Sequence, residues 1–119
     1  MIELDRNMIY YLSHPCTSCG EIEENRKMEK ECYEKILLKQ TGMLNRKEPK
    51  RNKIKIVRPL IEIEENAEWH DAMKKCVEML AGCDAIIMCG EWEKSRGCLD
   101  EYDKAREWGM DIYYYEGIV

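Results

Sequence analysis

Short apolar runs alternate along this chain with longer segments in which apolar residues recur at helical spacing. The predicted strands are residues 8–12, 54–57, 85–88 and 111–115. The predicted helices are residues 21–40, residues 69–81 with a stop at Gly82, and residues 97–108 with Gly109 as the cap. Strands that alternate with helices in this way predict an α/β fold, a three-layer domain in which helices flank a four-stranded parallel sheet.

The length and charge of the chain limit its organisation. With 119 residues we expect one domain over residues 1–119. The net charge of −5 argues against a nucleic acid polymer as partner, because phosphate neutralisation needs basic surface. The basic stretch 42–53 is expected to be a solvated loop, with a lid or an anion-attracting flap as the alternative. The N-terminus lacks the order of a signal peptide, and no apolar run approaches the ~18 residues of a membrane span, so we expect a cytoplasmic protein.

The seven cysteines do not resemble a disulfide framework, because their number is odd and they are spread through predicted strands and helices. Cys16 and Cys19 form the one pair with redox or zinc spacing, but no second close pair follows. The other five cysteines stand alone in the sequence. We therefore expect reduced, incidental thiols and no metal, with a redox or zinc protein as a weaker alternative.

Residues 83–101 predict a buried strand, a loop containing glycine, and a helix that begins near Gly97. On that helix one stripe is apolar apart from a single carboxylate, Glu101; its other members are Cys98, Tyr102, Ala105 and Trp108. A carboxylate that a protein keeps on a buried face is often functional. The alternative is structural, because a first-turn glutamate also stabilises the helix dipole.

Ligands of parallel sheets lie at the carboxyl ends of the strands. In this chain those ends carry the segments Ser13 to Thr17, Arg58-Pro59, and Cys89 to Gly97. We therefore place the candidate binding residues in these segments; they are Ser13, His14, Arg58, Cys89, Gly90, Trp92, Ser95 and Gly97.

At these same segments the sequence resembles a known family over nearly the whole chain. The residues that carry the resemblance are Ile9 to Pro15, Trp69, Cys83-Asp84-Ala85, and Trp92 to Glu101. They resemble a phage-associated family of unknown function within the nucleoside 2-deoxyribosyltransferase-like superfamily. The resemblance implies a flavodoxin-like topology and a homo-oligomer. The run Tyr113 to Tyr115 is a plausible contact between subunits, with the ordinary end of a strand as the alternative.

The resemblance also implies roles for individual residues. Glu101 matches the glutamate that attacks the anomeric carbon in characterised relatives, and Tyr11 matches the tyrosine that holds it. Ser95 matches a position that is serine in nucleotide hydrolases and aspartate in nucleoside transferases, which indicates a ligand with a 5′-phosphate. A serine hydroxyl and the free amides near Gly97 suit a phosphate, whereas an aspartate would repel it.

Three departures from the relatives bear on activity. His14 stands where a glycine is usual and either narrows the pocket or adds a contact. Cys89 stands where transferases carry an aspartate that handles the proton of the leaving base. Arg58 replaces an asparagine and is expected either to clamp a phosphate or to pair with Glu62.

The sequence thus favours a nucleotide-binding enzyme without a cofactor. Glu101 would be its nucleophile in cleavage or exchange of an N-glycosidic bond, which makes it a deoxyribosyltransferase or an N-glycoside hydrolase. The alternative is a protein without turnover that senses or sequesters a nucleotide-derived signal, such as an anti-defence sponge of a phage. His14 and Cys89 favour this alternative.

Overall fold

The computed structural model describes residues 3–16, 21–41, 54–64 and 67–119. Four parallel strands form one sheet in the order β2-β1-β3-β4. The strands are β1 (Ile9–Ser13), β2 (Lys55–Val57), β3 (Ala85–Met88) and β4 (Asp111–Tyr114). The helices are α1 (Ile22–Thr41), α2 (Pro59–Glu62), α3 (Trp69–Ala81), the 3-10 turn η3 (Trp92–Lys94), α4 (Arg96–Glu107) and α5 (Tyr115–Ile118). The predicted α/β class with a flanked parallel sheet is confirmed.

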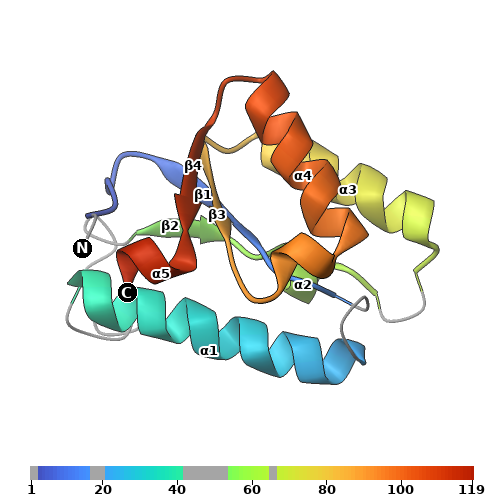
Figure 1. Cartoon of the computed structure of the whole chain (residues 1–119), viewed down its shortest axis with the longest axis horizontal. Helices are drawn as coiled ribbons and strands as arrows, with labels where there is room; N and C mark the ends of the chain where they lie inside the picture. The colour runs from blue at the N-terminus through green and yellow to red at the C-terminus, as the bar shows by residue number, and fades with distance from the viewer. Residues whose placement is uncertain (1–2, 17–20, 42–53, 65–66) are drawn as a thin grey trace.

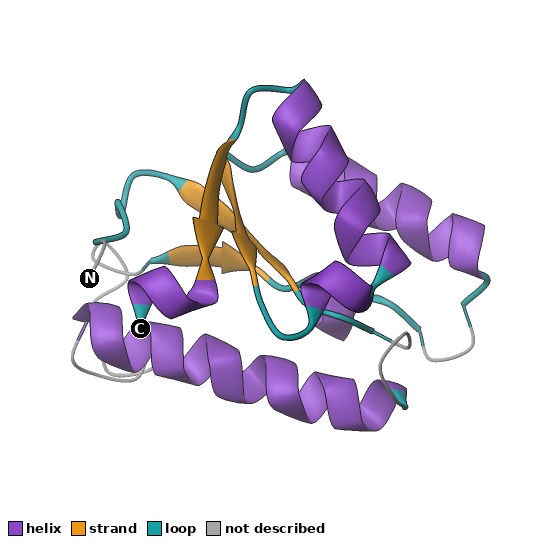
Figure 2. Ribbon diagram, in the orientation of Figure 1, coloured by secondary structure: helices purple, strands orange, loops and turns teal. Residues whose placement is uncertain are grey.

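Helices cover both faces of the sheet (Figures 1 and 2). On one face, Tyr10 and Leu12 of β1 pack with Ile36 and Leu37 of α1 and with Ile118 of α5. The second core, on the face covered by α3 and α4, consists of Tyr11, Ile63, Cys76, Leu80, Ile86, Met88, Cys98 and Ala105. Successive residues of a strand point to opposite faces, so Tyr11 and Ser13 point toward α3 and α4 while Tyr10 and Leu12 point toward α1.

Three short helices were not predicted. Segments α2 and η3 have four and three residues, too few to show a period in the sequence. The last residues, expected to extend the strand to 115 and then form an arm, instead form α5, which buries Ile118 completely against the α1 face. Each of these segments follows the carboxyl end of a strand: α2 follows β2, η3 follows β3 and α5 follows β4.

Helix α4 begins at Arg96 with Ser95 as its N-cap, one residue before the expected start. It ends at Glu107, so Trp108 lies beyond the helix and is 42% exposed. The prediction that Trp108 belongs to the buried stripe is therefore wrong. The other members of the stripe are buried or half-buried against the sheet, as expected; they are Cys98, Glu101, Tyr102 and Ala105.

None of the helices within the described ranges has the length and apolar character needed to cross a bilayer. The stretch 42–53, expected to be a basic loop, lies outside the described residues.

Candidate functional site

A cavity of about 140 Å³ opens beside the carboxyl ends of the strands, between α2, α3 and the start of α4. An apolar cavity of this order holds one ring-sized group. Its lining is largely apolar, with a few polar groups and one buried carboxylate. The lining residues are His14, Cys16, Ile22, Pro59, Leu60, Ile63, Glu64, Ala67, Trp69, Ala72, Met73, Cys76, Ser95, Gly97, Cys98 and Glu101.

Glu101 is the buried carboxylate of this cavity, with 5% of the residue exposed. The hydroxyl of Tyr11 donates a hydrogen bond to Oε2, and the hydroxyl of Ser13 donates to Oε1 at 2.8 Å. Both donors come from β1, whose alternation turns Tyr11 and Ser13 toward α4. Each carboxylate oxygen therefore has a fixed position at the cavity wall.

Burial raises the pKa of Glu101 to about 7, although the hydrogen bonds from Tyr11, Ser13 and Cys76 favour its charge. Burial and the neighbouring carboxylate raise the pKa of Tyr11 as well, so Tyr11 stays a neutral phenol that can donate. Near neutral pH the cavity thus holds a carboxyl group that is divided between its two protonation states. Such a group is suited to nucleophilic or acid–base chemistry.

The start of α4 forms the wall beside Glu101. The Ser95 hydroxyl accepts a hydrogen bond from the Cys98 amide at 3.3 Å and so caps the helix. The amides of Arg96 and Gly97 belong to the first turn, where a helix has no acceptor of its own for its N–H groups. A Cβ on Gly97 would lie 3.2 Å from Met73 Sδ, so a glycine here lets α4 pack closely on α3.

The structure brings six of the ten predicted site residues together. His14, Ser95, Gly97 and Glu101 line the cavity, and Tyr11 and Ser13 bond Glu101. The other four lie elsewhere: Arg58, Cys89, Gly90 and Trp92 are not part of the cavity lining.

A family model described as a domain of unknown function (DUF4406) matches residues 8–114. The chain belongs to the DUF4406 family. No curated protein and no solved structure gives a match.

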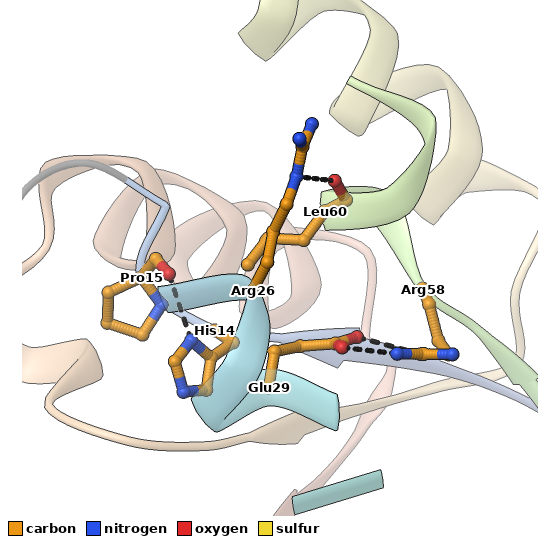
Figure 3. A network of polar contacts seen from close by, with 6 residues as sticks. All are labelled: His14, Pro15, Arg26, Glu29, Arg58 and Leu60. Carbon is orange, nitrogen blue, oxygen red and sulfur yellow. Dashed lines mark hydrogen bonds and ion pairs between the residues drawn. The ribbon is translucent and has the colours of Figure 1, made fainter. Parts of the chain in front are cut away.

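In this DUF4406 domain the partly buried Arg58 forms an ion pair with the fully buried Glu29 of α1 (Figure 3). Its guanidinium donates to the two carboxylate oxygens at 3.0 and 2.6 Å and lies 4.2 Å from the centre of the Tyr33 ring. The prediction that Arg58 pairs with Glu62 is therefore wrong. The bidentate geometry expected for a phosphate is used for a carboxylate within the fold.

Cys89 and Gly90 directly follow β3, and neither lines the cavity. Cys89 is fully buried in the core on the α1 face. Gly90 has a φ of 63°, and a Cβ there would lie 2.9 Å from His14 Nε2. Gly90 therefore allows the loop to pass directly over the imidazole. Trp92 packs against Tyr102 and Tyr114, with ring centres 5.1 and 6.0 Å away.

Several cavity residues of the DUF4406 domain were not predicted as site residues. Trp69, Met73 and Cys76 have the spacing of a packed helix face, which gives no sign that part of this face lines a cavity. Burial raises the pKa of the Cys76 thiol to about 12, so this thiol stays neutral beside Glu101. Cys16 also lines the cavity, but Cys19, its partner in the predicted pair, lies outside the described residues.

No group of three or more histidine, cysteine or acidic side chains suited to a metal ion occurs in the part of the chain that the structure describes.

Proposed function

We propose that this DUF4406 domain binds a nucleotide and cleaves or exchanges its N-glycosidic bond, with Glu101 as the nucleophile. The observation that carries the proposal is the Glu101 carboxylate, held at the cavity wall by hydrogen bonds from Tyr11 and Ser13. A buried carboxylate with both oxygens fixed is well placed to meet a carbon atom that becomes positively charged.

The chemistry follows from that placement. As the bond between the anomeric carbon and the base nitrogen breaks, the base leaves with the electron pair and takes a proton from water. Positive charge develops on the sugar, and Glu101 stabilises it and then bonds to the anomeric carbon. Water or a second base releases the sugar from the resulting ester. Tyr11 and Ser13 orient the attacking oxygens and remain neutral throughout. The carboxyl group must be ionised to attack, so activity should rise as the pH passes about 7.

The surroundings of Glu101 support a nucleotide as ligand. The cavity volume suits a sugar ring, and Trp69 and Met73 offer an apolar surface on which a base can stack. The first-turn amides of α4 and the Ser95 hydroxyl provide donors for a 5′-phosphate. Membership of the nucleoside 2-deoxyribosyltransferase-like superfamily, an association with phages, a cytoplasmic location and a homo-oligomer are parts of the same proposal, supported by the sequence resemblance.

A second candidate is a binder without turnover, and the position of Cys89 favours it. The end of β3 is the position from which a transferase aspartate would handle the proton of the leaving base. Here the side chain is a thiol buried in the core on the other face of the sheet. With His14 in the cavity wall, the pocket would then hold a nucleotide-derived signal without cleaving it.

Base release separates these two candidates. The wild-type protein is expected to liberate free base from at least one member of a panel of nucleoside monophosphates, their deoxy forms and NAD-derived nucleotides. Glu101→Ala should release none and still bind that nucleotide, because the phosphate and base contacts remain. Chromatography of the products and calorimetric titration give the two measurements. If the wild type binds a nucleotide firmly but releases no base, the enzyme proposal is rejected and the binder without turnover is retained.

Ser95→Asp tests the phosphate position. Aspartate is also a good N-cap, so the helix should persist, but its charge would repel a phosphate. We expect the affinity for a nucleoside monophosphate to fall about tenfold, a difference of about 1.4 kcal/mol, with little change for the nucleoside. Ser95→Asn is the matched neutral cap and should retain most of the phosphate preference. Equal losses for nucleoside and nucleotide would contradict a phosphate at this site.

A further inference from the structure

The charge of the cavity wall limits which base the site would take. Two carboxylates line the cavity: Glu101, which is buried, and Glu64, which is exposed. Among the residues that the structure describes, no lysine or arginine lines this cavity. Such a wall attracts positive charge on the group that it encloses. Since the phosphate of the ligand is proposed to lie at the first turn of α4, the positive charge would be on the base.

Trp69 supplies an aromatic surface for a base of this kind. Its ring is part of the cavity wall, and the guanidinium carbon of Arg96 lies 4.4 Å from the ring centre. A flat, delocalised cation therefore already lies over this ring. Arg96 is exposed and does not line the cavity, so its guanidinium can give way to a ligand. The Trp69 ring is thus suited to a planar base that carries a positive charge.

The imidazole in the cavity wall is badly placed to protonate a departing base. The Nδ1 of His14 lies 2.9 Å from the Pro15 carbonyl oxygen, as Figure 3 shows. The Nε2 lies close to the backbone of Gly90, where an added Cβ would be only 2.9 Å from it. Both ring nitrogens therefore face the backbone of neighbouring residues rather than the cavity.

The hydroxyl and thiol groups beside Glu101 are also unsuited to this role. Tyr11 and Ser13 direct their protons to the Glu101 carboxylate. The raised pKa of Cys76, about 12, makes this thiol a weak acid, and burial raises the pKa of Cys16 as well. A neutral base leaves as an anion unless an acid protonates it, whereas a base with a positive charge on its glycosidic nitrogen leaves as a neutral molecule. The wall therefore favours the cationic base.

We propose that the nucleotides this site takes carry a cationic base, a pyridinium joined to the sugar through its ring nitrogen; this inference rests on the function proposed above. The bond between that nitrogen and the anomeric carbon breaks, and its electron pair neutralises the pyridinium. A carboxylate oxygen of Glu101 bonds to the anomeric carbon, so a cation and an anion become two neutral groups and no proton moves. Water then displaces the carboxylate from the anomeric carbon and loses one proton to the solvent.

Binding tests the preference for a cation without turnover. The probes are the carbocyclic analogue of nicotinamide mononucleotide, which cannot be cleaved in this way, and its reduced form, in which the ring is neutral. Calorimetric titration of the wild type at about pH 8 should show at least about tenfold tighter binding of the charged probe. Equal affinities would overturn the inference, and this measurement needs no variant.

Two tryptophan variants test the aromatic surface. Trp69→Leu should lower the ratio of the two affinities at least about threefold, because it removes the ring but keeps apolar bulk. The control Trp108→Leu removes an exposed tryptophan outside the cavity and should leave the ratio unchanged. A ratio that Trp69→Leu does not change would overturn the role of this ring.

Turnover distinguishes a failure of this inference from a failure of the proposed function. The wild type should release nicotinamide from nicotinamide mononucleotide at least about tenfold faster than uracil from uridine monophosphate. Release of uracil or another neutral base without release of nicotinamide would overturn the inference and leave the glycosidic function standing. Tighter binding of the charged probe without release of any base would retain the cationic ligand and reject the turnover.

Discussion

Replacement of Arg58 by methionine is expected to lower the free energy of unfolding by about 3–5 kcal/mol. The side chain of Glu29 is 0% exposed, so its carboxylate would remain in the core without a partner. Hydrogen bonds to Glu29 raise the pKa of Arg58 although burial lowers it, so this pairing favours the charged guanidinium. Urea denaturation monitored by circular dichroism gives the change in the unfolding free energy.

Two further variants identify the cause of this loss. Glu29→Met alone should cost less, because the Arg58 side chain retains 16% exposure and can reach water. The double variant Glu29→Met, Arg58→Met should recover much of the stability, since an apolar pair of similar volume replaces the buried ions. If the double variant is as unstable as Arg58→Met, lost packing on Tyr33 rather than an unpaired carboxylate is responsible.

Glu101→Gln is expected to stabilise the fold in neutral and alkaline solution. Burial raises the pKa of Glu101 from 4.5 to about 7, so the unfolded chain releases this proton at lower pH than the folded chain. The contribution of Glu101 to stability is therefore greatest below about pH 4.5 and is lost as the pH rises to about 7. The loss amounts to roughly 3 kcal/mol. Glutamine is neutral over this whole pH range, so the Glu101→Gln variant avoids this loss of stability.

The informative quantity is the difference in unfolding free energy between Glu101→Gln and wild type, measured at about pH 4 and about pH 8. Other titrating groups cancel in this difference, which should increase by roughly 3 kcal/mol toward pH 8. Asp103→Asn removes an exposed carboxylate from the same helix and should show no such increase. A difference that is constant with pH would mean that Glu101 has the same pKa in the folded and the unfolded chain. Burial would then not set the pKa of the proposed nucleophile.

The elements that the sequence predicts correctly are those long enough to show a period. The spacing of Trp69, Cys76 and Leu80 identifies α3, and the continuous run from Ala85 to Met88 identifies a central strand. The burial of Glu101 is confirmed because it follows from the phase of a single helix. The segments α2, η3 and α5 have no comparable signal, since their positions depend on contacts with distant parts of the chain.

Contacts between residues far apart in the chain could not be predicted from the sequence. Arg58 has acidic neighbours nearby in sequence, but it pairs with Glu29, which lies 29 residues earlier in the chain. The cavity could not be predicted for a similar reason. The apolar face of α3 has the same composition whether it packs against other side chains or lines an open space.

The central claim is that Glu101 bonds to the sugar. The measurement that tests it most directly is the mass of the acid-quenched protein, followed by peptide mapping, after incubation with a 2-fluoro analogue of the nucleotide that releases base. The fluorine slows breakdown of the glycosyl ester, so wild type should gain the mass of one sugar phosphate on the peptide that contains Glu101, and Glu101→Gln should gain none. Base release from the nucleotide with Glu101 left unmodified by the analogue, or a sugar attached to another residue, would contradict the account.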